Sequence, residues 1–149
     1  MLRLAVAALV LAVGPVQAAR AAGALEMMTT SACFCCHAWA MHLREAGYSV
    51  AVKSLAMGQL MRQKLGAGVP AALAACHTGR IDGYVIEGHV PVREIRRLLA
   101  ERPEAIGLAV PGMPIGSPGM EAGSKRAAYE VLLIKRDGTT EVFATYAGN

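Results

Sequence analysis

Residues 25–47 read LEMMTTSACFCCHAWAMHLREAG, and this stretch decides the fold class. Its first part, residues 25–30, reads as a short strand that ends in small polar residues. The part after the cysteines has helical spacing, with an apolar side made of Trp39, Leu43 and Ala46 and with Ala40 beside it. Gly47 is placed to end that helix in the left-handed conformation. The cysteines therefore lie where a strand meets the start of a helix.

The rest of the chain continues this alternation of strands and helices. We expect a strand at 48–55, a helix at 57–65, a single helical turn at 70–73, two short strands at 76–81 and 84–87 with a turn at Asp82-Gly83, and a helix from Pro91 to Arg102. The helix at 57–65 is expected to bury Met57 and Met61 as core residues. Residues 107–123 read as a loop, and 129–135 with 140–146 as a hairpin. This order predicts a single α/β domain of the thioredoxin-like type with a C-terminal β-hairpin extension.

The first residues are typical of an export signal. Arg3 is followed by the apolar run 4–13, and Val16-Gln17-Ala18 resembles a cleavage site. The apolar run is shorter than the roughly 20 residues of a spanning helix. We therefore predict a signal peptide at residues 1–22, a metal-binding domain at 23–149, a periplasmic location and no stable membrane insertion after cleavage. An uncleaved membrane anchor is the alternative.

Composition limits the function classes. The formal net charge is +4 over 149 residues, and no stripe of Lys or Arg concentrates it, so nucleic-acid binding has no support. The four cysteines of an exported chain would ordinarily suggest two disulfides. Their spacing indicates a different use.

The cysteines form a compact pattern of soft ligands. Cys33, Cys35 and Cys36 lie at a helix start, where unpaired N–H groups and the helix dipole favour thiolates. In a thioredoxin-like sheet, the segment that carries Cys76 faces the same helix start. Soft thiolates suit copper(I), which accepts two or three sulfur ligands, whereas zinc prefers a regular tetrahedron from separated pairs. The pattern therefore predicts a copper(I) site, with copper ions and other periplasmic copper-handling proteins as partners.

Two other functions stay open. Cys33 and Cys36 have the C-x-x-C spacing of thiol–disulfide oxidoreductases, so a thiol–disulfide or copper-linked oxidoreductase is the alternative. Against it, Cys35 is a competing thiol inside the pair, and residues 73–76 lack the proline that such enzymes place before the third strand. A metal-binding protein is thus favoured over an enzyme. A disulfide-stapled interaction module, without metal, is the third possibility.

Several histidines and methionines are secondary candidates. His37 and His77 directly follow cysteines, and each can ligate a metal, donate a hydrogen bond to a ligand sulfur, or simply be a polar residue near the site. Met113 and Met120 lie in the loop, where thioethers can bind copper(I) or act as hydrophobic plugs. We expect His42 at the surface of a helix and His89 in a structural turn.

At these residues the chain resembles the CopG-like periplasmic proteins, a former domain of unknown function that is associated with copper resistance. The matching stretches are CFCC at 33–36, Trp39, His42-Leu43, Gly47-Tyr48, CHT at 76–78, GYVIEGHVP at 83–91 and GLAVPGMPIGSPGME at 107–121. The resemblance implies a thioredoxin-like fold, a periplasmic setting and copper binding by the cysteines. This chain lacks the proline that the family usually has before the cluster. It has Phe34 where the family usually has glycine, and Phe34 is not expected to adopt a positive φ.

Overall fold

The computed structural model describes residues 22–149. The predicted signal peptide lies outside the described residues except for Ala22, which belongs to the first strand. The elements follow in the order β1 (Ala22–Thr29), α1 (Phe34–Glu45), β2 (Tyr48–Ser54), α2 (Met57–Gly66), the short 3₁₀ helix η1 (Ala71–Leu73), β3 (Thr78–Ile81), β4 (Tyr84–Glu87), α3 (Val92–Glu101), β5 (Ala105–Ala109), β6 (Tyr129–Lys135) and β7 (Thr140–Tyr146).

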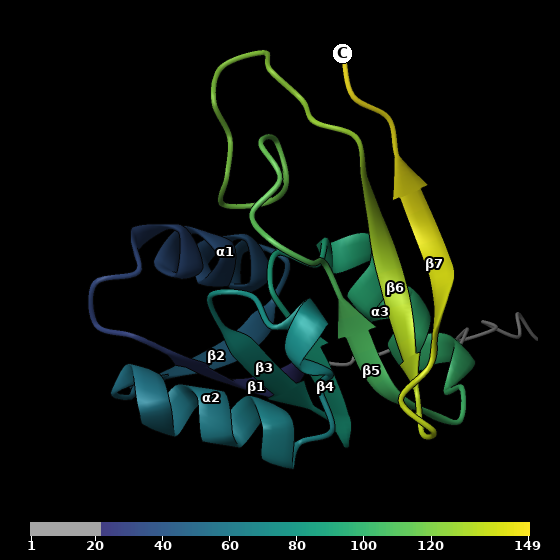
Figure 1. Ribbon diagram of the computed structural model, residues 1–149. Coiled ribbons are helices and arrows are strands. Elements are labelled where there is room, and N and C mark those ends of the chain that lie inside the picture. Colours follow the sequence, from purple (N-terminus) through teal and green to yellow (C-terminus); the bar gives the residue numbers. More distant parts are fainter. Residues whose placement is uncertain (1–21) are drawn as a thin grey trace, which may run out of the picture.

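The strands form one seven-stranded sheet in the order β2-β1-β3-β4-β5-β6-β7 (Figure 1). β1 pairs in parallel with β2, and β4 in parallel with β5. The remaining neighbours pair antiparallel. The prediction of a mixed α/β fold is therefore confirmed.

Helices cover the sheet on both sides, with α1 and α2 on opposite faces (Figure 1). The apolar side of α1 buries Cys36, Trp39, Ala40 and Leu43. The Trp39 indole N–H donates to the carbonyl of Val90 at 2.8 Å, which satisfies the polar atom of this buried ring. Gly47 follows α1 with a φ of 93°, as the helix-ending pattern predicts. The bond from Trp39 to Val90 therefore connects the middle of α1 to the segment that precedes α3.

The loop prediction is wrong for residues 107–109, which belong to β5. Gly107 pairs with Val85 of β4, and a Cβ atom on it would lie 1.8 Å from the Val85 carbonyl oxygen. Glycine is therefore needed here for close strand approach, although in a sequence pattern it reads as a strand breaker.

The packing prediction for α2 is also wrong. Met57 and Met61 are 63% and 36% exposed, whereas Leu60 and Lys64 are buried. Residues four apart lie on the same side of a helix, so Met57 and Met61 share one side of α2 and Leu60 and Lys64 share another. The side with Leu60 and Lys64 is the buried one. Lys64 is buried because it has a buried partner, Glu87.

The last two strands continue the sheet beyond β5, and a turn at Gly138 joins them. The Tyr146 hydroxyl donates to Glu94 Oε2 at 2.5 Å, and the rings of Tyr129 and Tyr146 stack with centroids 4.6 Å apart. Glu94 is buried on α3. This bond connects the C-terminal strand to α3.

Candidate metal centre

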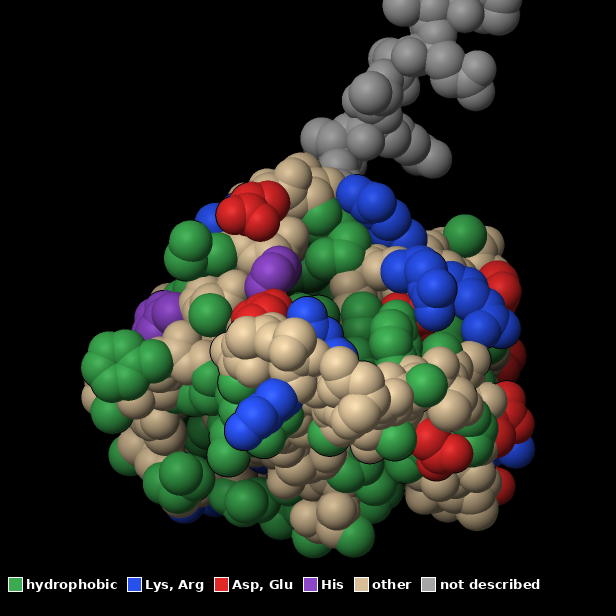
Figure 2. All heavy atoms as spheres, turned by 90° about the horizontal axis from the view of Figure 1, so that it is seen from above, with side chains coloured by type: hydrophobic (Ala, Val, Ile, Leu, Met, Phe, Trp, Pro, Cys, Tyr) green, Lys and Arg blue, Asp and Glu red, His purple; other side chains and the backbone are tan. Residues whose placement is uncertain are grey.

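The turn between β1 and α1 carries three cysteines. The Cys33 amide donates to the carbonyl of Thr30, and Cys33 is the N-cap residue of α1. Phe34 is the first residue of the helix, so it does not need the positive φ of a glycine. Its ring is 88% exposed, which explains how the turn accommodates a bulky residue. Figure 2 shows one face of the molecule, on which exposed hydrophobic side chains (green) lie next to histidine side chains (purple).

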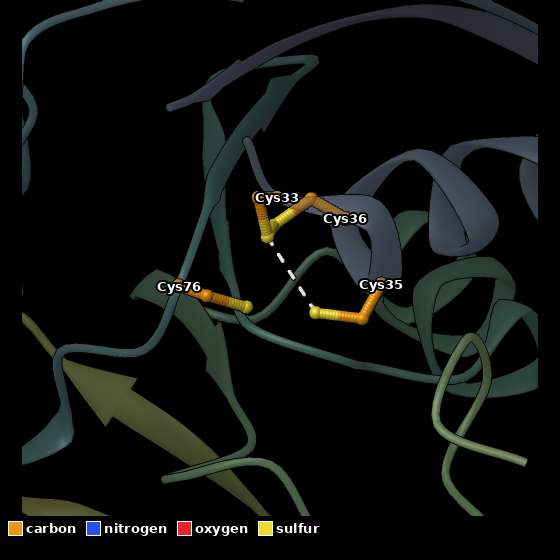
Figure 3. A group of neighbouring side chains, drawn as sticks. All are labelled: Cys33, Cys35, Cys36 and Cys76. Carbon is orange, nitrogen blue, oxygen red and sulfur yellow. Dashed lines mark hydrogen bonds between the residues drawn. A yellow bond between two sulfur atoms is a disulfide. The ribbon is translucent and has the colours of Figure 1, made fainter. Parts of the chain in front are cut away.

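All four cysteine sulfurs lie within 4.8 Å of one another. Cys33 and Cys36 form a disulfide, while Cys35 and Cys76 are free thiols. The Cys33 and Cys35 sulfurs are 3.5 Å apart, and Cys76 faces Cys35 from the other side of the site (Figure 3). The structure thus brings together three sulfurs from one turn and one from a distant segment.

A buried charged network holds the segment that carries Cys76. Glu87 Oε1 accepts hydrogen bonds from the Ala75 amide and from Lys64 Nζ, both at 2.6 Å. Thr78 donates to Glu87 Oε2 at 2.6 Å and accepts from Lys64 Nζ at 2.8 Å. Burial raises the pKa of Glu87, and the Lys64 ammonium opposes this shift. The network fixes the residue directly before Cys76 to α2 and β4.

Two buried histidines contact the Cys76 thiol. His89 Nε2 lies 3.2 Å and His77 Nδ1 3.4 Å from the sulfur, and these three residues form a second group whose ligand atoms lie within 4.8 Å of one another. Burial lowers the pKa of both imidazoles, and for His77 the neighbouring His89 and Lys64 add to the shift. Burial and the nearby Cys35 raise the pKa of the Cys76 thiol to about 12. Both imidazoles are therefore neutral at pH 7, with a lone pair on one nitrogen each.

The loop after β5 packs against the cysteine turn. Gly119 has a φ of 84°, and a Cβ atom on it would lie 2.7 Å from the Cys35 carbonyl oxygen and from the Trp39 amide nitrogen. The preceding residue, Pro118, accepts a hydrogen bond from His89 Nδ1 at 2.8 Å. The loop therefore positions both a cysteine turn and a histidine.

The other predicted ligands lie at different depths. His37 is exposed and belongs to neither of the two groups found in residues 22–149. Met113 is 54% exposed, and Met120 is half-buried. His42 is at the surface, as expected, where it pairs with Glu121 at 2.8 Å.

Sequence reasoning missed His89 and the network around Lys64. The sequence predicts His89 in a structural turn because it precedes Pro91 closely, and its partner Pro118, 29 residues away, is seen only in the fold. Lys64 had a detectable signal, since it follows the apolar Leu60 by four residues and so lies on the same helix face. Its buried partner could be found only in the fold.

The chain is similar to one family model and to solved structures of one protein. A family model described as a protein of unknown function, DUF411, matches residues 73–120. A solved structure named copper resistance protein CopG, form 2, is 41% identical, with a TM-score of 0.77 over 83% of this chain and 98% of that one. Form 1 is 42% identical, with a TM-score of 0.76 over 84% and 98%. No curated protein matches by sequence. Within residues 22–149, no helix is long and apolar enough to cross a membrane.

Proposed function

The chain belongs to the CopG family of copper resistance proteins, and on this premise we propose that it binds copper(I) in the periplasm through a thiolate cluster. The ligands are Cys33, Cys35, Cys36 and Cys76. The single observation that carries the proposal is the mutual approach of the four sulfurs to within 4.8 Å. Thiolates are soft ligands and prefer copper(I) over harder ions.

The crowding of the ligands favours copper over zinc. Three of the four sulfurs come from one turn of four residues, which is a difficult source for a regular tetrahedron around one zinc ion. Copper(I) accepts two or three sulfurs, and a thiolate can bridge two ions. We therefore assign the site to copper(I) without fixing the number of ions. Met113, Met120, His37 and His77 remain secondary candidates.

The number of thiolates available to a metal ion depends on whether Cys33 and Cys36 form a disulfide. The Cys33–Cys36 disulfide removes two of the four thiolates. Its reduction takes two electrons and two protons, for example from a dithiol that becomes a disulfide. The full ligand set therefore belongs to the reduced protein.

The same disulfide supports a second candidate function. A C-x-x-C pair at a helix start can pass two electrons and two protons to a substrate disulfide, leaving the Cys33–Cys36 disulfide behind. The β1–α1–β2–α2–β3–β4–α3 order supports our assignment of a thioredoxin-like domain, in which such enzymes are built. Cys35 and Cys76 have no part in this exchange, so their presence favours the metal site.

A comparison of cysteine variants tests the two functions. The reduced mature protein is titrated anaerobically with copper(I) against a competing chelator, and its reduction of a model disulfide is measured in parallel. For a cluster, Cys35→Ser should impair copper binding about as much as Cys33→Ser, and Cys76→Ser should also reduce stoichiometry or affinity.

The enzyme function makes the opposite prediction. There, Cys35→Ser keeps full copper affinity, while Cys33→Ser and Cys36→Ser lose reductase activity. Unchanged copper binding in Cys76→Ser would limit the site to the Cys33–Cys36 turn.

A further inference from the structure

A pocket of about 450 Å³ lies between α2 and the strands β1, β2 and β3, on the face of the sheet opposite α1 (Figure 1). No cysteine or histidine lines it, so it is separate from the metal centre. Its charged lining residues are Lys53, Arg62, Arg80 and Glu26. We propose that this pocket binds a phosphate monoester. The proposal does not depend on copper binding by the cysteines.

The three cations of the pocket come from three different elements. Lys53 lies on β2 beside Met28 of β1. Arg80 lies on β3 beside Glu26 of β1. Residues two apart in a strand point to the same face, so Glu26 and Met28 share one face of β1, with a cation on the strand at either side. Arg62 lines the pocket from α2, so positive groups approach it from the helix and from two strands.

These cations have no partner in the described part of the chain. Lys53, Arg62 and Arg80 make no side-chain hydrogen bond or ion pair there, whereas every other described lysine or arginine except Lys125 makes at least one. Glu26 is the only acidic residue that lines the pocket, and it forms no ion pair with Arg80 although the two are neighbours in the register. Positive groups that are held together repel one another, and a bound anion relieves this repulsion.

Gln59 adds a hydrogen-bond donor to the pocket. Its Oε1 accepts from the backbone N–H of Ala56 at 3.4 Å, at the start of α2. A backbone N–H can only donate, so the side-chain oxygen is engaged and the NH₂ group is left for a ligand. Arg62 and Gln63 follow Gln59 by three and four residues and therefore lie on the same side of the helix. α2 thus presents one guanidinium and two amide groups to the pocket.

This donor set fits a phosphate monoester better than a carboxylate. A phosphate monoester carries a charge of about −1.5 to −2 at pH 7 and three acceptor oxygens, whereas a carboxylate carries one charge and two oxygens. Guanidinium groups bind phosphate oxygens through paired N–H donors. The pocket volume of about 450 Å³ also leaves room for the organic part of an ester.

Titration with inorganic phosphate tests the pocket. The metal-free mature protein, with its disulfide closed, is titrated at constant ionic strength while amide NMR spectra are recorded. We expect saturable binding of a single equivalent that shifts the signals of Gln59 and its neighbours. Arg62→Gln and Arg80→Gln should each weaken binding at least about fivefold, because each removes a charged donor. Glu26→Gln should strengthen binding at least about twofold, because it removes a negative charge from the pocket.

Lys125→Gln is the matched control, because Lys125 also lacks a partner but does not line the pocket, and it should bind phosphate like the unaltered protein. Parallel titrations with glycerol 3-phosphate and with phosphatidylcholine vesicles that contain phosphatidic acid distinguish a soluble ester from a lipid headgroup, according to which binds more tightly. Acetate, which carries a single carboxylate, should bind more weakly than phosphate.

Three results would overturn the proposal. They are the absence of saturable binding with every phosphate probe, acetate binding as tight as phosphate binding, and a loss in Lys125→Gln as large as the losses in Arg62→Gln and Arg80→Gln. The NMR spectrum of each variant shows whether it is folded, and the two arginine variants test the pocket independently. Failure of the copper cluster would appear separately, in the copper(I) titration of the reduced chain.

Discussion

Replacing Lys64 by methionine should destabilise the protein strongly. Lys64 is 1% exposed and Glu87 0% exposed, and their charged atoms are 2.6 Å apart. Removing one partner of a buried ion pair costs about 3–5 kcal/mol, because the other charge stays buried without compensation. Glu87 would keep its hydrogen bonds from Ala75 and Thr78. We therefore expect the free energy of unfolding to fall by about 3 kcal/mol, at the lower end of this range. With a urea m-value of about 1.5 kcal/mol/M, the midpoint falls by about 2 M.

The loss should depend on pH. Burial already raises the pKa of Glu87 above its ordinary value of 4.5, and removing Lys64 raises it further. A raised pKa favours the protonated form in the folded state, so this group stabilises the fold below its ordinary pKa and loses that contribution as pH rises through the folded pKa. The deficit of Lys64→Met should therefore shrink as pH falls from neutrality, when Glu87 becomes neutral.

A double variant gives the decisive measurement. Glutamine at position 87 can still accept from Ala75 and can donate to Thr78, so Lys64→Met/Glu87→Gln should recover to within about 1 kcal/mol of the starting protein. Urea unfolding of the two single variants and the double variant, with the disulfide state held fixed, measures the coupling. Exposed Lys53→Met is the control, with a change below about 0.5 kcal/mol. If the two single losses simply add, the buried pair is not coupled and the reasoning fails.

Two further predictions follow from local geometry, and a third follows from the sequence of the N-terminus. Gly119→Ala should destabilise the fold by at least about 1 kcal/mol more than Gly123→Ala in urea unfolding, because both positions have positive φ but only Gly119 lacks space for a Cβ; equal losses would contradict this. Tyr146→Phe should cost about 1–3 kcal/mol through the bond lost by buried Glu94, and an unchanged midpoint would refute it. N-terminal sequencing of periplasmic protein should find a start within residues 19–23, whereas an intact Met1 would exclude cleavage.

Local patterns predicted most of the elements. Gly47 and the Asp82-Gly83 turn both have the positive φ that their positions required. The spans 129–135 and 140–146 agree with β6 and β7. The errors arose where a distant partner decides the structure. Gly107 is in a strand because it allows β5 to approach Val85, and α2 buries Lys64 because Glu87 meets it.

In the candidate site, too, the local arrangement could be predicted from the sequence, whereas the contacts between distant residues could not. The spacing of Cys33, Cys35 and Cys36 placed three sulfurs in one turn, and the expected fold placed Cys76 opposite them. The pairing of Cys33 with Cys36 was only one of several open alternatives, since spacing alone does not select a partner. The contact of His89 with Cys76 could not be predicted, because it depends on a fold that brings residues 13 positions apart together.

The two halves of the site respond differently to oxidation. The α1 turn changes its ligands when the Cys33–Cys36 disulfide opens or closes, whereas Cys76 is held from the other side by the Glu87 network and contacts two fixed imidazoles. Under the proposed function, the reduced chain offers four soft thiolates, whereas the oxidised chain keeps only the thiols of Cys35 and Cys76. Cys35 and Cys76 are the thiols common to both states. The redox state of the turn would therefore set how many thiolates a metal ion can bind, two with the disulfide closed and four with it open.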